Sequence, residues 1–374
     1  MAERTAEREA APTPPPPPTP RRGRFALPEH FPVRGTILVI LSIAIVLGVT
    51  LGTISTLRTG RFTGANWIDL FINGVARGSV YALIALGYTL VYGILFMINF
   101  AHGEVFMAGA FTALFAAFAL NEHGVLNSSP ILSIGILFLV SMVTSMVIAI
   151  TLERVAYRPL RGAPRLVPLI TAIGASLFLQ YTFRGLYGAN ARAYPRINIL
   201  EGSWTLFGAN VARTQVVVIL GALALMIGLY LFIARTRTGR SMRAVGEDKE
   251  IASLMGINVD RTIVTTFAIG GFLAGAAGIL YVFLFNQVIF TMGFFPGIKA
   301  FTAAVLGGIG SITGAAIGGL LLGVAEAVGP ILFLTGAGID SPNQLQPVVA
   351  FGILVLVLIF RPGGILGAPE EKRA

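Results

Sequence analysis

The feature that most constrains this sequence is a series of apolar blocks about 20 residues long, separated by polar connections. A helix of about 20 apolar residues spans the hydrocarbon core of a bilayer, which is roughly 30 Å thick. Only 12% of the residues are charged, which is about half the share usual in soluble domains. So little polar surface cannot coat a water-soluble globule. The sequence therefore predicts an all-helical, polytopic integral membrane protein.

The apolar blocks predict a membrane helical bundle of about nine to ten segments. The block at 298–335 exceeds a single crossing at about 1.5 Å per residue, and its centre, Gly307–Ser311, is rich in glycine. We therefore expect two short crossings there, joined by a tight turn. The other blocks lie at 35–57, 68–96, 104–120, 130–152, 166–183, 214–235, 262–287 and 347–361.

The polar segments complete the predicted organisation. Residues 1–34 are a tail rich in Pro and Arg, and a proline run cannot form a helix, so we expect a disordered cytoplasmic tail. The block at 35–57 is too long for the core of a cleavable signal peptide and predicts an extra N-terminal membrane anchor. The remaining predicted divisions are a transmembrane domain at 66–367, a cytoplasmic loop within it at 236–261, and a cytoplasmic C-terminal tail at 368–374.

Basic residues mark the connections that we expect to face the cytoplasm. The chain has a formal net charge of +10, and Lys and Arg are enriched in cytoplasmic loops of membrane proteins. The connections 153–165 and 236–261 are rich in arginine, whereas 336–346 has no Lys or Arg. The connection 184–213 carries arginines although the helix count places it outside; longer loops follow the rule less closely. The positive charge therefore does not indicate a nucleic-acid partner.

The sequence lacks the residues that several kinds of chemistry require. Without cysteine there is no disulfide, thiolate metal site or cysteine nucleophile. His30, His102 and His123 do not have the spacing of a metal site. The chain also lacks the G-x-x-x-x-G-K-[ST] phosphate loop. We therefore expect no catalytic residue, no metal and no cofactor in this chain, which is predicted not to be an enzyme.

The region 69–110 combines apolar residues with polar ones that belong to a helix face and a turn. Tyr81, Tyr88 and Tyr92 recur at helical spacing, which fits packing, an interfacial belt or the lining of a translocation path. The helix is expected to end within Asn99–Glu104, because Gly103 can break it and free backbone groups to face protein or water. We expect this turn to be structural or to act in gating; His102 and Glu104 resemble a catalytic pair but lack a nucleophile or a metal.

The polar segment 234–262 predicts a short amphipathic helix. Acidic residues suit a helix N-terminus, and Gly256 suits the C-terminal stop. The acidic residues are Glu247, Asp248 and Glu250, and the apolar residues on one side are Ile251, Leu254 and Met255. Such a helix can lie on lipid, brace the bundle or dock into a groove of a partner.

The C-terminal half contains two intramembrane charges and several glycine pairs. Glu326 lies among apolar residues and could be a proton relay, a protonated acid or a hydrogen-bonded one. Lys299 lies at a predicted segment end, where it can snorkel. Glycines four residues apart predict close helix packing or a mobile helix pair at a gate; they include Gly271 with Gly275 and Gly319 with Gly323.

Three stretches carry a family resemblance. They are Gly78–Phe111, with the pattern INFAHGE at its centre, Gly239–Thr262, and Ala300–Glu326 together with Phe360–Gly367. In these stretches the chain resembles the permease subunit of the high-affinity, Liv-type ABC importers of branched-chain amino acids. The resemblance covers roughly residue 66 to the end, so the tail and the anchor depart from the family pattern.

The resemblance implies a non-catalytic permease of the bacterial inner membrane that forms half of a translocation pathway for branched-chain or related amino acids. It implies as partners a second homologous permease, two cytoplasmic ATPases that bind the ATP, and a periplasmic or lipid-anchored amino-acid binding protein. The expected pathway and gate residues are Tyr81, Tyr88, Tyr92, Asn99, His102, Gly103 and Glu104. The expected ATPase-coupling residues are Glu247, Asp248, Ile251, Ala252, Leu254, Met255, Gly256 and Ile257.

Three alternatives stay open at this stage. A permease of a urea or short-amide ABC importer belongs to the same class. A proton-coupled secondary transporter would use Glu326 or Glu104 and would drive uptake in liposomes without ATPases. An intramembrane enzyme would use His102 with Glu104 and would show turnover in detergent without partners.

Overall fold

The computed structural model describes residues 33–367 except positions 165, 207, 340 and 362. The predicted tail therefore lies outside the described residues except for its last two, which begin helix α1 (Val33–Arg58); the predicted C-terminal tail also lies outside them. The chain divides after Val49 into two compact units. Within the second unit, Ser55 Oγ donates to Gly336 O at 2.9 Å, and Gly336 N–H donates to Thr56 Oγ1 at 2.8 Å.

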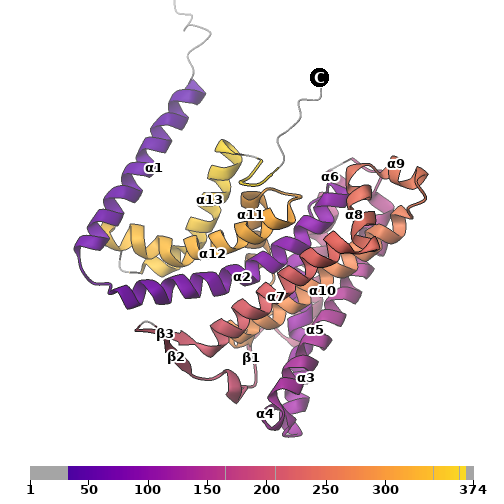
Figure 1. Ribbon diagram of the computed structural model, residues 1–374, viewed down its shortest axis with the longest axis horizontal. Coiled ribbons are helices and arrows are strands. Elements are labelled where there is room, and N and C mark those ends of the chain that lie inside the picture. Colours follow the sequence, from indigo (N-terminus) through magenta and orange to yellow (C-terminus); the bar gives the residue numbers. More distant parts are fainter. Residues whose placement is uncertain (1–32, 165, 207, 340, 362, 368–374) are drawn as a thin grey trace, which may run out of the picture. The chain divides into compact units, whose positions relative to one another are not determined.

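Nine helices of the described chain are long and apolar enough to cross a membrane, which confirms the all-helical, multi-pass fold (Figure 1). Besides α1 they are α2 (Gly64–Leu95), α3 (His102–Glu122), α5 (Pro130–Leu152), α6 (Leu166–Tyr187), α7 (Arg213–Arg235), α10 (Val259–Phe285), α12 (Ile312–Leu334) and α13 (Gln346–Phe360). A shorter apolar helix, α11 (Phe294–Gly307), lies between α10 and α12 in the chain.

Short elements connect these helices. The helical ones are α4 (Val125–Ser128), the π-helix η1 (Glu153–Tyr157), the 3₁₀ turns η2 (Arg158–Leu160), η3 (Asn198–Leu200), η4 (Thr335–Ala337) and η5 (Pro342–Leu345), and helices α8 (Arg237–Glu247) and α9 (Lys249–Leu254). Strand β1 (Arg192–Ala193) pairs antiparallel with β4 (Gln287–Val288), and β2 (Ser203–Leu206) pairs with β3 (Ala209–Ala212) as a hairpin.

The long block at 298–335 breaks at its glycine-rich centre, as the sequence predicts. Helix α11 ends at Gly307, and Gly308 and Gly310 follow with φ angles of +106° and +95°. Such angles are accessible to glycine without steric cost. Ser311 then caps α12 by accepting the Gly314 N–H at 3.1 Å. The turn therefore separates two helices that pack against each other.

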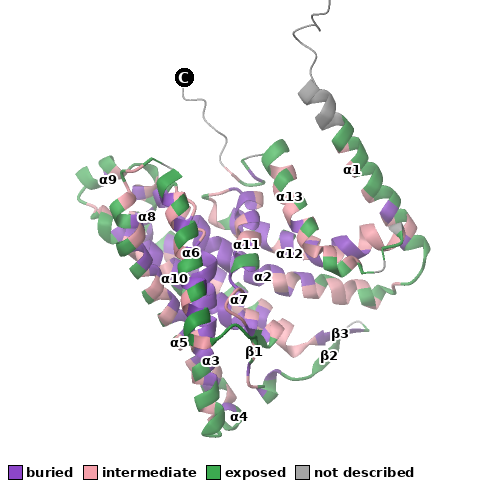
Figure 2. Cartoon of the chain, turned by 180° about the vertical axis from the view of Figure 1, so that it is seen from behind, coloured by how far each residue is buried: buried purple, intermediate pink, exposed green. Residues whose placement is uncertain are grey.

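The core of the second unit lies along α2, α3 and α10, each of which carries more buried residues than any other helix (Figure 2). The predicted glycine pairs provide ordinary close packing. Gly271 and Gly275 of α10 lie against the backbone of α5, and Gly319 and Gly323 of α12 lie against α2. Ser141 Oγ of α5 also donates to the Gly275 carbonyl at 2.7 Å. Small residues and hydroxyls of this kind let membrane helices approach closely.

The second unit has two ends. The first, called the α9 end, holds α8, α9 and the C-terminus of α2. The second, called the strand end, holds the four strands, the start of α7 and the end of α10. The α9 end contains the connections that the distribution of basic residues predicts to be cytoplasmic.

Candidate functional site

Helices α2 and α3 are joined by a break inside the bundle. Phe96 ends α2 in the left-handed conformation, with φ of +56°, and its N–H donates to Tyr92 O at 2.8 Å. Residues 96–101 are irregular, and α3 begins at His102. The expectation that α2 ends within Asn99–Glu104 is therefore wrong by several residues, because the left-handed Phe96 ends α2 first.

Gly103 does not break the helix but allows a close backbone contact. It lies in the first turn of α3, where a Cβ would meet the Gly293 carbonyl and come within 3.1 Å of Gly297 Cα. Gly297 in turn faces the Tyr88 hydroxyl. A larger residue at position 103 would push α11 away from α3.

His102 and Glu104 do not form a pair. Glu104 is buried, and its Oε1 accepts hydrogen bonds from Gln180 Nε2 at 2.6 Å and Ser176 Oγ at 3.3 Å. Its Oε2 has no hydrogen-bond partner among the described residues and lies beside Gly293. The His102 ring packs edge-on against Tyr88, with centroids 5.0 Å apart. The arrangement gives no general-base pair for catalysis.

The three tyrosines of α2 have different surroundings. Tyr81 is buried beside Lys299, whose Nζ lies 3.5 Å from the Tyr81 hydroxyl. Tyr88 is buried and also contacts the Phe301 ring, with centroids 6.3 Å apart. Tyr92 is partly buried and packs against Phe96. Tyr88 and Tyr92 therefore belong to one aromatic cluster with α11, whereas Tyr81 belongs to a charged one.

Tyr88 and Tyr92 lie where three neighbouring cavities meet. A cavity of about 730 Å³, called the inner cavity, opens at the α9 end between α2, α8 and residues 309–312. It shares Tyr92 and Ile309 with a constriction of about 10 Å³, called the throat. The throat shares Tyr88 with a cavity of about 230 Å³ between α6 and α11, called the α6 cavity. A volume of about 10–15 Å³ holds one water at most, so the aromatic side chains close the throat.

The predicted amphipathic helix is present as α9, with one change at its start. Asp248 is its N-cap and accepts the N–H groups of Glu250 and Ile251 at 2.7 and 2.9 Å. Glu247 ends the preceding helix α8 and lines the inner cavity, so it does not open the helix as expected. Gly256 follows with φ of +82°, as a C-terminal glycine does.

Helix α9 leaves an apolar face in solvent at its end of the bundle. Leu254 is 86% exposed and Met255 is 78% exposed, and Ile251 is exposed as well. Ala252, on the opposite side, is buried, and its carbonyl accepts the N–H of Ile257 at 3.0 Å. The helix is thus attached to the bundle by Ala252 while the three larger apolar residues point away from it.

Helices α8 and α9 contact the break between α2 and α3 directly. The Lys249 ammonium lies 5.9 Å from the centre of the Phe96 ring, within the range of a cation–π contact. Burial, together with the nearby Arg161 guanidinium, lowers the pKa of Lys249. A Cβ on Gly246 would lie 2.9 Å from the Gly93 carbonyl. The end of α2 and the α8–α9 segment are therefore in direct contact at two points.

A second contact runs from the start of α10 to the same break. Arg161 forms ion pairs with Glu153, which is fully buried, and with Asp260 of α10. Four residues after Glu153, the Tyr157 hydroxyl donates to Asn99 Oδ1 at 2.6 Å. Asn99 lies in the break, so the π-helix η1 connects the start of α10 to it. The sequence singles out none of the site residues Glu153, Tyr157, Arg161, Gln180 and Ser176. Their one sequence signal is a polar residue within or next to an apolar block.

Glu326 is not an isolated membrane carboxyl. It forms an ion pair with Lys299 of α11; the Glu326 side chain is buried and the Lys299 side chain is partly buried. Lys299 therefore does not snorkel as expected, because Glu326 of α12 provides a counter-charge inside the bundle. Arg77 of α2 lies nearby and donates to Gln346 Oε1 at 2.8 Å.

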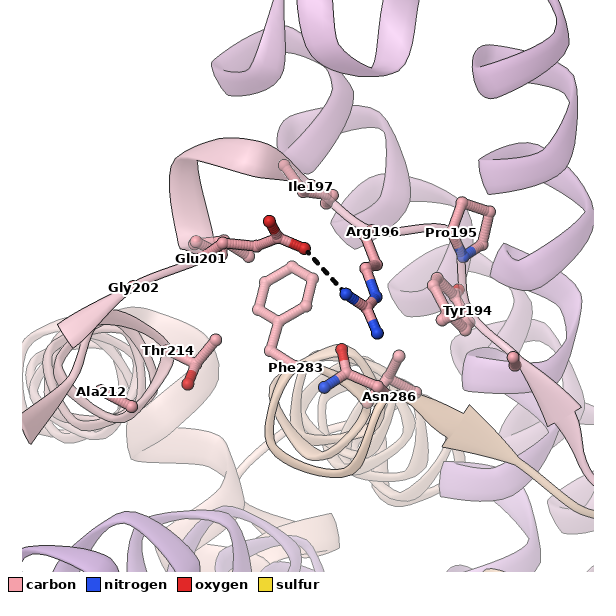
Figure 3. Close-up of a pocket in the computed structure, with 13 residues that line it drawn as sticks. Tyr194, Pro195, Arg196, Ile197, Glu201, Gly202, Ala212, Thr214, Phe283 and Asn286 are labelled. Atoms are coloured by element: carbon pink, nitrogen blue, oxygen red, sulfur yellow. Dashed lines mark ion pairs between the residues drawn. The ribbon is translucent and has the colours of Figure 1, made fainter.

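A fourth cavity, of about 530 Å³, lies at the strand end (Figure 3). Arg196 and Glu201 pair across it at 3.7 Å, and both are exposed, so the pair adds little stability. Tyr194 donates to Ala110 O at 3.3 Å, and burial raises the pKa of its hydroxyl. None of the predicted pathway residues or ATPase-coupling residues lines this cavity. Among the residues described, no group of three or more His, Cys, Asp or Glu could hold a metal.

Comparison with known proteins identifies the family. The family described as "Branched-chain amino acid transport system / permease component" matches residues 70–358. The permease protein BraD of Pseudomonas aeruginosa is 46% identical over 82% of this chain and 98% of its own length. LivH of Escherichia coli is 43% identical over 82% of this chain and 97% of its own length.

A solved structure, PsaBC from Streptococcus pneumoniae in complex with Fab, is 12% identical and has a TM-score of 0.41, over 82% of this chain and 96% of that one. The family match spans most of the chain and includes the break, the α8–α9 segment and the Lys299–Glu326 pair. This chain therefore belongs to the family of branched-chain amino acid transport system permeases.

Proposed function

We propose that this chain is the membrane permease subunit of an ATP-driven importer for branched-chain or related amino acids in the bacterial inner membrane. The relatives BraD and LivH are both named as permeases of high-affinity branched-chain amino acid transport systems. The observation that carries the proposal is the position of α9. Its exposed apolar face, at Leu254 and Met255, belongs to a helix that touches the break where the cavities narrow.

The pathway is proposed to follow the cavities from the α6 cavity through the throat to the inner cavity. Tyr88 and Tyr92 form the narrow part with Phe301, and Gly103 keeps α3 and α11 close enough to hold it shut. Asn99 and His102 fix the break and the start of α3 through their contacts with Tyr157 and Tyr88. Opening requires only that the aromatic cluster separates.

Coupling is proposed to start at α9. A face with Leu254, Met255 and Ile251 exposed to water is unfavourable by about 25 cal/mol for each Å², and a groove on an ATPase subunit would bury it. Movement of α9 would then reach the break through Lys249 and Phe96 and through the ion pairs of Arg161. In this proposal two ATPase subunits bind and hydrolyse the ATP, and a second permease and an amino-acid binding protein complete the importer.

The rival readings fit the contacts less well. A proton-coupled carrier needs a carboxyl that can bind and release a proton, but Glu326 is paired with Lys299, and Glu104 accepts hydrogen bonds from Gln180 and Ser176. A hydrolytic site needs His102 to reach Glu104, whose Oε1 instead accepts from Gln180 and Ser176. A urea or short-amide importer would not need the apolar α6 cavity.

Leu254→Asp tests the proposal. The variant places a carboxylate where the ATPase groove would lie, and an unpaired buried charge is strongly disfavoured. We expect normal membrane insertion, loss of the ATPase subunits on co-purification and loss of leucine uptake. Ile199→Asp is the matched control, since Ile199 is an exposed apolar residue at the strand end. Co-purification of the ATPases with Leu254→Asp at wild-type stoichiometry would show that α9 is not the docking helix.

A further inference from the structure

The α6 cavity has apolar walls and a buried carboxyl group behind one of them. Closing the throat requires neither feature. Its walls are largely apolar, with Ile173 and Leu177 from α6, Phe294 and Ile298 from α11, and Phe100 from the break. Its volume is about 230 Å³. An apolar cavity of about 150 Å³ holds a benzene molecule. The α6 cavity is therefore large enough for the four-carbon side chain of leucine.

A carboxyl group lies behind one wall of this apolar space. Ser176 lines the α6 cavity, and its hydroxyl donates to Glu104 Oε1 at 3.3 Å. That distance is longer than the usual 2.5–3.0 Å for an O–H···O bond. The bond is therefore weak, and a cationic donor can displace it. The Glu104 side chain has an exposed fraction of 1%. Its Oε2 has no hydrogen-bond partner in the described part of the chain.

We propose that the α6 cavity is an intramembrane binding site for the transported amino acid. The aliphatic side chain occupies the space between Ile173, Leu177 and Phe294. The α-ammonium group displaces the Ser176 hydroxyl and binds Glu104. The inference rests on the proposed function and adds to it the residues that recognise the substrate.

Two observations favour an amino acid over a lipid acyl chain, the other apolar occupant of a membrane cavity. Glu104 is buried, and the contact of its Oε1 with the Ser176 hydroxyl is long; an ammonium group would give this oxygen a stronger, charged donor, whereas an acyl chain would not. The cavity also shares Tyr88 with the throat. A substrate held there is next to the gate, and Tyr88 can respond to its presence.

A size test separates these occupants. Ile173→Trp fills the α6 cavity, and one extra methylene in a tight apolar site already changes discrimination by about tenfold or more. In proteoliposomes with the complete importer, we expect ATP-dependent leucine uptake to fall at least about tenfold. Uptake of alanine, which has a one-carbon side chain, should change by less than about twofold. Ile170→Trp is the control, because Ile170 is on the same helix and 67% exposed and is not among the residues that line the cavity.

The role of the Glu104 carboxyl in binding the α-ammonium group is tested separately. Glu104→Gln keeps the acceptor for Gln180 but removes the charge, so uptake of both leucine and alanine should fall about tenfold or more. Wild-type uptake by Glu104→Gln would show that the Glu104 carboxyl does not bind the substrate.

A labelling experiment covers the case in which the tryptophan variant does not fold. The chain has no cysteine, so Ile173→Cys and Ile170→Cys each introduce one thiol. Leucine should slow alkylation by N-ethylmaleimide at position 173 and not at position 170.

Leucine uptake at the wild-type rate by Ile173→Trp, or equal labelling of position 173 with and without leucine, would overturn the site while leaving the proposed function intact. Such a result would assign the cavity to lipid. Absence of ATP-dependent uptake of any amino acid by the wild-type importer would overturn both.

Discussion

At the scale of single residues, the packing of the helices depends on glycines whose surroundings leave no room for a side chain. Gly103 is the clearest example, because a Cβ at this position would meet Gly293 and Gly297 of the neighbouring segment. The break between α2 and α3 and the start of α11 meet at this contact. The volume at position 103 therefore sets the distance between two elements of the proposed gate.

Gly103→Ala is expected to destabilise the protein by about 1–3 kcal/mol, the usual cost of forcing extra volume into a packed site. The amount of folded protein and its thermal midpoint in detergent measure this. Gly174→Ala is the control, because nothing lies within 4 Å of a Cβ at that position of α6. There alanine should stabilise the helix by about 0.5–1 kcal/mol. Equal midpoints for the two variants would contradict the packing argument.

Lys299 and Glu326 offer a second test at this scale. Lys299→Met or Glu326→Leu leaves one charge inside the bundle without its partner, which costs about 3–5 kcal/mol. The double variant Lys299→Met/Glu326→Leu removes both charges and is expected to recover most of the stability. Thermal midpoints of the four proteins measure the coupling. If Glu326 were a proton site, the double variant would be stable but inactive; we expect it to retain uptake.

At the scale of elements, the π-helix η1 connects the start of α10 to the α2–α3 break. Arg161 holds the buried Glu153 and Asp260 at once, and η1 carries Tyr157 to Asn99. Loss of the guanidinium leaves Glu153 buried without a partner, so η1 is expected to shift.

Arg161→Gln is therefore expected to uncouple ATP hydrolysis from amino-acid uptake. The ATPases should stay bound, since α9 is unchanged, while leucine transported per ATP hydrolysed falls several-fold. Arg158→Gln is the control, because its pair with Asp260 is about half exposed on both sides and contributes about 0–1 kcal/mol. An unchanged ratio of transport to hydrolysis in Arg161→Gln would remove η1 from the coupling route.

The elements themselves could largely be predicted from the sequence. Block length and glycine content located most of the spans and the turn at Gly307–Ser311, because a membrane-spanning helix must satisfy its own backbone and remain apolar. The end of α2 was misplaced, because a left-handed phenylalanine at position 96 has no sequence signature. The start of α9 differs by two residues from the predicted Glu247, since Glu247 and Asp248 are both acidic and only the structure shows that Asp248 is the N-cap.

The contacts of the candidate site could not be predicted in the same way. Gln180 lies 76 residues after Glu104 and Glu326 lies 27 residues after Lys299, and nothing local in the sequence pairs them. Each of these polar groups is surrounded by apolar residues that satisfy helix periodicity on their own. Helix packing alone decides which of them meet.

At the scale of the whole molecule, the second unit has a wide cavity at the α9 end, a closed throat and a smaller cavity beyond it. This asymmetry places the narrow point near the break that α9 contacts. In the proposed pathway, only the short aromatic barrier has to move for a substrate to pass, while the packing of α2, α10 and α12 is kept.

The pairing of Lys299 with Glu326 has an electrical consequence. Any movement of α11 relative to the membrane would carry the two opposite charges together as long as the pair holds, so little net charge would cross the membrane field. One uncompensated charge moved across 100 mV would add about 2.3 kcal/mol to each cycle. A zwitterionic amino acid adds no net charge either. Leucine uptake into proteoliposomes with internal ATP and a potassium diffusion potential should therefore proceed at the same rate at 0 mV and at about −100 mV, and a several-fold voltage dependence would mean that a charge travels alone.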